Sequence, residues 1–206
     1  MRRVFAGFIS LALIFTLSAC TNISEPKSTN DVQDYSINDP EIIYNSSLLS
    51  RVDSLKVGNN SAMSSLARSL AGGAFVDHIQ LYTTKEPYGL EVIYKDFNSL
   101  DIRPTSDISE YSKYYQTVFS SDLAFKRTMF YDSVVVFAIV NNADFYRGRL
   151  GDKSFTLTRK QVEKYLGKKA SYYMNNRSIF DTEITPLLTE GSSKLDAFLN
   201  SLSFDK

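Results

Sequence analysis

His78 is the only histidine in a chain of 206 residues, so it is the only imidazole available as a general base. A Ser-His-Asp triad could use no other residue, yet no Gly-x-Ser-x-Gly elbow and no His-Glu-x-x-His pair accompanies it. The alternating residues Asp77–Thr84 predict a half-buried strand in which His78 faces outward with Gln80 and Tyr82. We therefore interpret His78 as a surface residue and keep a hydrolase or enzyme-accessory site around it as the alternative.

Other patterns that could support catalysis lie in unsuitable places. Ser24–Lys27 and Ser203–Lys206 have the Ser-x-x-Lys spacing, but the first lies in a polar linker and the second ends the chain. Carboxylates are scattered without a pair whose surroundings would separate their pKa values. There is no phosphate-binding loop, dinucleotide fingerprint or calcium loop. The sequence predicts a non-enzymatic protein without a cofactor or a metal site.

The single cysteine, Cys20, follows a short targeting segment. Arg2 and Arg3 precede an apolar run of 14 residues, 4–17, which is shorter than the ~20 residues that span a bilayer as a helix. The run ends in Leu17-Ser18-Ala19-Cys20, which resembles the lipobox of bacterial lipoproteins. That resemblance implies cleavage between Ala19 and Cys20 and a diacylglycerol on the Cys20 thiol, whereas the alternative is an uncleaved anchor with an incidental cysteine.

Composition and organisation fit a lipid-anchored extracytoplasmic protein. With 43% hydrophobic and 22% charged residues the chain is typical of globular proteins, and its 23 basic and 23 acidic side chains argue against nucleic-acid binding. We expect a signal peptide at residues 1–19, the lipidated cysteine and a flexible tether at 20–40, and a single domain at 41–206. Two acyl chains on Cys20 would hold the protein stably at the cell membrane.

Turn residues between alternating segments predict two hairpins. Strands at 77–84 and 90–94 flank Lys85-Glu86-Pro87-Tyr88-Gly89, and strands at 144–150 and 153–157 flank Gly151-Asp152. Without a βαβ rhythm, these hairpins favour an α+β fold of antiparallel hairpins packed with three to four short helices.

Helical signals are local. Asn59 or Asn60 can cap a helix that ends at Gly72-Gly73, Thr158 and Gln161 fit a capping box before a helix that stops at Gly167, and a last helix runs from Ser192 or Ser193 to Leu202. Ser121-Asp122 opens a further helix that runs towards the apolar residues 134–140. Periodicity alone leaves those residues open as a buried strand or a helix.

Basic residues concentrate between Arg147 and Arg177, where nine basic and two acidic side chains give +7. Such a segment could contact an anionic lipid or wall polymer. The alternative is a solvated face scattered by folding. The candidate contacts are Arg159, Lys160, Lys164, Lys168 and Lys169.

Three motifs carry a resemblance to a family. Val57-Gly58-Asn59-Asn60-Ser61, residues 81–90 with Glu-Pro-Tyr-Gly-Leu, and residues 136–144 follow in an order that resembles an uncharacterised domain of Gram-positive bacteria. That domain is found in small lipoproteins and outside the membrane in zinc-peptidase sensors of the beta-lactam antirepressor type. The resemblance covers about residues 42–166 and implies a ligand-sensing or protein-interaction domain at the cell envelope, with no catalytic residues. Pro87, Tyr88 and Gly89 are its most specific residues, and we expect them to fix the hairpin turn or to form a binding surface.

Overall fold

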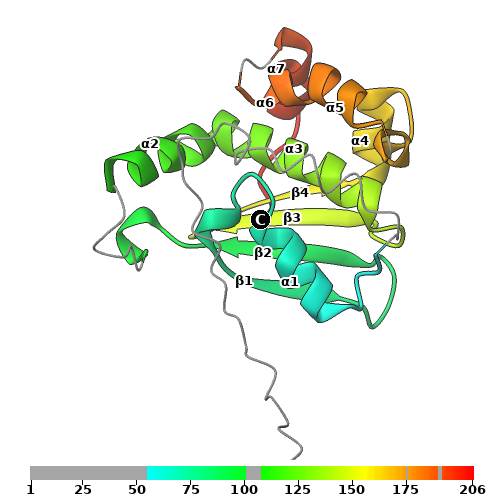
Figure 1. The fold of residues 1–206 in the computed structure, drawn as a ribbon, viewed down its shortest axis with the longest axis horizontal. Coiled ribbons are helices and arrows are strands. Elements are labelled where there is room, and N and C mark those ends of the chain that lie inside the picture. The colour runs from blue at the N-terminus through cyan, green and yellow to red at the C-terminus, as the bar shows by residue number, and fades with distance from the viewer. Residues whose placement is uncertain (1–54, 101–107, 175, 190–191) are drawn as a thin grey trace, which may run out of the picture. The chain divides into compact units, whose positions relative to one another are not determined.

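A four-stranded sheet forms the centre of the fold in a computed structural model, which describes residues 55–100, 108–174, 176–189 and 192–206 (Figure 1). The strands are β1 (Val76–Tyr82), β2 (Gly89–Tyr94), β3 (Phe145–Leu150) and β4 (Lys153–Thr158), side by side in this order. The predicted signal peptide, Cys20 and the tether lie outside the described residues.

The α+β class and both predicted hairpins are confirmed. β1 pairs with β2 and β3 with β4 in antiparallel register, and Gly151 takes a φ of 60° in the second turn. The middle of the sheet differs from the expectation, because β2 and β3 are parallel, with Leu90 opposite Tyr146. The connection between them contains α2 (Ile108–Phe119) and α3 (Asp122–Ile139), so the chain does contain one strand–helix–strand crossover.

The apolar residues 134–140 belong to the longest helix, except for Val140 at its C-terminal boundary. The Ser121 hydroxyl accepts a hydrogen bond from the Ala124 amide and caps α3, which then runs for 18 residues. This helix is buried almost all round, because α2, α7 (Ser193–Asn200), β3 and β4 all pack against it. A helix covered on every side shows no amphipathic period, which is why its sequence resembles a buried strand.

Shorter helices begin at the predicted caps. α1 (Asn60–Arg68) starts after Asn59, whose side chain accepts from the Ala62 amide, and packs on β1. α4 (Arg159–Leu166) has the complete Thr158–Gln161 capping box and ends at Gly167 with a φ of 69°. α7 begins after Ser192, as expected.

More helices are present than the three to four expected. The structure adds α2, α5 (Arg177–Glu183), α6 (Thr185–Thr189) and three-residue to four-residue 3₁₀ turns, including Gly73–Phe75 before β1. α5 and α6 lie between α4 and α7 at one end of α3 (Figure 1). No helix within the described ranges is long and apolar enough to cross a membrane.

The first described residue is attached to the end of α3. The Leu55 amide donates to the Ile139 carbonyl at 2.9 Å, and the Asn141 amide donates to the Leu55 carbonyl at 3.1 Å. These two bonds form an isolated parallel bridge between Leu55 and Val140. The chain therefore enters the domain beside the C-terminal end of its longest helix.

Candidate functional site

The three motifs of the family resemblance meet in space. The Val57 amide donates to the Asn142 side-chain oxygen at 2.9 Å, which joins the first motif to the third. The Tyr88 amide donates to Asp144 Oδ2 at 2.8 Å, and the Asp144 amide donates back to the Tyr88 carbonyl at 2.8 Å. Residues far apart in sequence thus form one junction at one end of the sheet.

The predicted turn residues act as structural parts of this junction. Gly89 is buried, and a Cβ built there would lie 2.3 Å from the Phe145 ring, so a larger residue would not fit without movement. The Glu86–Pro87 bond is cis, and Pro87 is exposed. Tyr88 is half-buried and is fixed through its backbone by Asp144. Of the two roles expected for this turn, the contacts describe the fixing of the hairpin.

Arg159 uses its guanidinium inside the fold. It donates to the carbonyls of Phe137, Val140 and Ala143 at 2.6–2.8 Å, and it lies over the Phe137 ring. These carbonyls follow the last turn of α3, where unpaired acceptors and the helix dipole favour a cation. Burial lowers the pKa of the Arg159 guanidinium, and no donor on this side chain is directed at a membrane or polymer.

The other candidate basic residues differ in exposure. Lys168 is half-buried, pairs with Glu183 at 2.9 Å and lies over the rings of Tyr172 and Tyr173. Lys160, Lys164 and Lys169 are exposed, and no ion pair involves them among the described residues. These three lysines are the part of the predicted basic segment that remains accessible.

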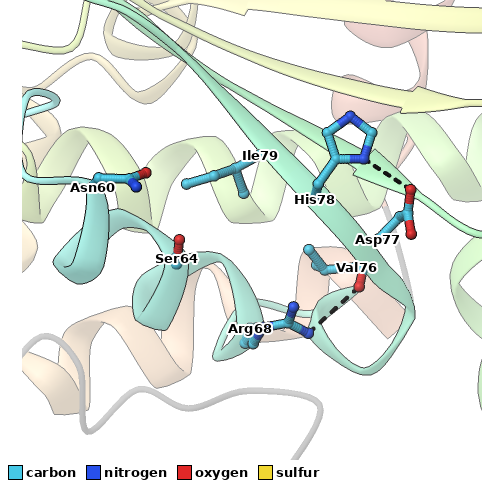
Figure 2. Close-up of a pocket in the computed structure, with 7 residues that line it drawn as sticks. All are labelled: Asn60, Ser64, Arg68, Val76, Asp77, His78 and Ile79. Atoms are coloured by element: carbon cyan, nitrogen blue, oxygen red, sulfur yellow. Dashed lines mark hydrogen bonds and ion pairs between the residues drawn. The ribbon is translucent and has the colours of Figure 1, made fainter.

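A shallow pocket of ≈ 260 Å³ lies between α1 and the first residues of β1 (Figure 2). Polar side chains dominate its lining, which comprises Asn60, Ser64, Arg68, Val76, Asp77, His78 and Ile79. Asn60, Ser64 and Arg68 are four residues apart, so they follow one stripe along α1. Arg68 donates to the Val76 carbonyl at 3.5 Å.

His78 borders this pocket without completing a catalytic triad. Its Nδ1 lies 2.8 Å from Asp77 Oδ2, and 63% of its side chain is exposed. Figure 2 shows the imidazole turned towards Asp77 and away from Ser64. The His78 hydrogen bond lowers the pKa of Asp77, and the Lys95 ammonium 3.5 Å away adds to that effect. The structure thus brings a serine, a histidine and an aspartate near one pocket, but it does not align them for proton transfer.

A second aspartate forms a buried polar cluster that sequence reasoning missed. Asp132 on α3 accepts from the Ala71 amide at 2.9 Å, from the Tyr146 hydroxyl at 3.2 Å and from the Tyr94 hydroxyl at 3.4 Å. Complete burial raises the pKa of Asp132 to about 7, although these donors act in the opposite direction. The Tyr114 hydroxyl donates to the Ala71 carbonyl on the edge of the same cluster. One carboxylate before the apolar run 134–140 was the available signal.

A third polar group occupies the sheet face that carries Gln80 and Glu91. Glu91 is buried and accepts from Tyr82 Oη at 2.6 Å and from Arg149 at 2.6–2.8 Å. Arg147 lies 3.7 Å from the same carboxylate and lies over the ring of Phe145. Because Glu91 opposes both arginines, the basic segment is partly neutralised within the fold.

Comparison with known proteins places these features in a family. The family described as Domain of unknown function (DUF4825) matches residues 49–163, which is more than half of the chain. The match includes α1 to α3, all four strands and the three motifs, and it ends within α4. No curated protein and no solved structure matches the chain. No group of three metal-ligating side chains occurs in the described part of the chain. The chain belongs to the DUF4825 family.

Proposed function

We propose that this protein is a lipoprotein held at the outer face of the cell membrane, in a Gram-positive envelope, by diacylglycerol on Cys20. The observation that carries the proposal is the order of signals at the amino terminus: Arg2-Arg3, the apolar run 4–17, and Leu17-Ser18-Ala19-Cys20. Small residues before the cysteine suit a signal peptidase, and two acyl chains make anchoring stable where one chain would not.

Metabolic labelling tests the anchor. Cells that express the full chain are grown with a radioactive fatty acid, and we expect label on the wild type and none on Cys20→Ala. Ser18→Thr keeps the cysteine and serves as the matched control, which should still be labelled. Equal labelling of the wild type and Cys20→Ala would overturn the proposal.

For the folded domain we propose a non-enzymatic interaction function towards a cell-envelope partner. Two features support it: the polar pocket along α1 and β1 is accessible, and the junction of the three motifs holds the neighbouring strands in fixed register. The exposed residues Lys160, Lys164 and Lys169 are candidate contacts to an anionic polymer or lipid headgroups.

A hydrolase is the second candidate, because Asp77 and His78 already form the 2.8 Å contact that orients a histidine base. Ser64 in the same pocket would have to be the nucleophile. A fluorophosphonate probe that labels activated serines tests this candidate. Labelling lost in both Ser64→Ala and His78→Ala would favour the hydrolase, and an unlabelled wild type would favour the interaction domain.

A further inference from the structure

β1 is an edge strand of the sheet, and its outer edge can be identified from backbone contacts. The Lys95 amide donates to the Phe75 carbonyl at 2.9 Å, so the odd-numbered residues of β2 direct their backbone groups at β1. Gln80 is opposite Glu91 and His78 is opposite Ile93. Because antiparallel residues alternate in direction, Ile79 and Leu81 direct their amides and carbonyls away from the sheet.

The carbonyl of Val76 provides an independent check of this alternation. Val76 is opposite Tyr94, an even-numbered residue of β2, and its carbonyl accepts from Arg68 on α1 rather than from β2. No hydrogen bond to another described residue satisfies the outward groups of Ile79 or Leu81. An edge with free donors and acceptors can pair with a further strand.

The pocket lies directly beside this edge. α1 presents Asn60, Ser64 and Arg68 along one side, and Val76–Ile79 form the other side (Figure 2). The groove is lined mainly by polar side chains. Side chains of an added strand could therefore enter the groove while its backbone pairs with β1.

Arg68 adds a charge preference. It is exposed, and its guanidinium has no carboxylate partner among the described residues, whereas Asp77 is already paired with His78 and Lys95. Arg68 contacts Val76, the first residue of β1. The carboxyl end of an antiparallel strand added to β1 would lie beside that first residue.

We propose that the free edge of β1 binds an extended peptide by antiparallel strand addition, with a carboxylate at the carboxyl end of the peptide bound by Arg68. The proposal rests on the interaction function proposed above and names its ligand class, an extended peptide segment with a terminal or side-chain carboxylate. Strand addition to Val76–Leu81 would order a segment of about six residues.

The test uses the full chain in detergent micelles and a bead library of random hexapeptides with free carboxyl termini. We expect the wild type to enrich a set of peptides. Affinities of the enriched peptides are then measured by fluorescence anisotropy with Arg68→Gln. Lys56→Gln, which removes another exposed cation outside the groove, is the matched control. A loss of roughly tenfold with Arg68→Gln and none with Lys56→Gln is expected.

Changes in the peptide separate the two parts of the proposal without disturbing the protein fold. N-methylation of the amides that face β1 should abolish binding, while N-methylation of the alternate amides should not. Amidation of the terminus, compared with Glu-to-Gln replacement in the peptide, shows which carboxylate Arg68 binds. No enrichment, or binding unaffected by Arg68→Gln or by both N-methylation patterns, would overturn the inference. Labelling of Cys20 is independent of these outcomes, so the anchor and the peptide site can fail separately.

Discussion

Asp77 and Asp132 show how burial separates two aspartates of the same chain. Asp77 is exposed beside the only histidine, and the His78 hydrogen bond lowers its pKa. Asp132 is completely buried among tyrosines, and burial raises its pKa to about 7. The aspartate that suggests catalysis in the sequence is thus a solvated surface group, whereas the one hidden beside an apolar run joins α3 to β2, β3 and the segment before β1. Position in the fold, rather than residue type, decides which carboxylate is costly to change.

Truncation of the two aspartates should give the largest contrast. Asp132→Ala leaves the Ala71 amide and two tyrosine hydroxyls without their acceptor, so we expect a loss of about 3 kcal/mol in the free energy of unfolding at pH 5. Asp77→Ala is the matched control, and its urea midpoint should equal that of the wild type. Similar midpoints for the two variants would contradict the contrast.

The pH dependence of stability should also come from Asp132. The folded chain keeps the proton to about pH 7, whereas the unfolded chain loses it near its ordinary value of 3.8. Stability from this group is therefore full below about pH 4 and declines as the pH rises towards 7, by roughly 3–4 kcal/mol. Urea unfolding of the wild type and Asp132→Asn from pH 4 to pH 8 checks this, since the decline should be absent from the variant. Parallel curves would show that Asp132 does not cause it.

Removal of one hydroxyl from the buried cluster should have a smaller effect. Tyr146→Phe deprives Asp132 and Tyr94 of a hydrogen-bond partner, and we expect a loss of about 1–2 kcal/mol in the free energy of unfolding. Tyr172→Phe changes an exposed tyrosine and should leave the urea midpoint in place. An unchanged midpoint in Tyr146→Phe would mean that the cluster does not stabilise the fold.

The smallest effect concerns the exposed pair. In His78→Ala, the pKa of Asp77 should rise towards its ordinary value, because the His78 hydrogen bond is the main cause of its lowering. Lys95 remains and keeps part of the effect. Carboxyl-carbon NMR during an acid titration measures the change. A pKa that stays where it is in the wild type would show that His78 does not hold this carboxylate.

Local signals in the sequence predicted local structure well. The Asn59 cap, the Thr158–Gln161 capping box and the Gly151 turn depend on residues within four positions of one another, and all are present. α2 was missed although Tyr111, Tyr114 and Val118 follow a helical period there. The overlooked pattern lies just after a proline-containing stretch.

Long-range features could not be read from these patterns. The parallel pairing of β2 with β3 depends on a crossover of about 50 residues, and nothing in either strand encodes its partner. Arg159 appeared to be one of several surface cations, because its three carbonyl acceptors lie 16–22 residues away. The pocket beside His78 was likewise hidden, since Arg68 and Ser64 reach it from another element.

The attachment of Leu55 to the end of α3 has a mechanical consequence. Any pull on the chain from its amino-terminal side reaches the described fold at Leu55, which is held by the backbone of Ile139 and Asn141. Val57 is held in turn by the Asn142 side chain. Since Leu55 pairs in parallel with Val140, a tether under tension would load these bonds together instead of opening them one at a time. The residues shared by the first and third motifs would then be the clamp that carries the load between a membrane anchor and the domain.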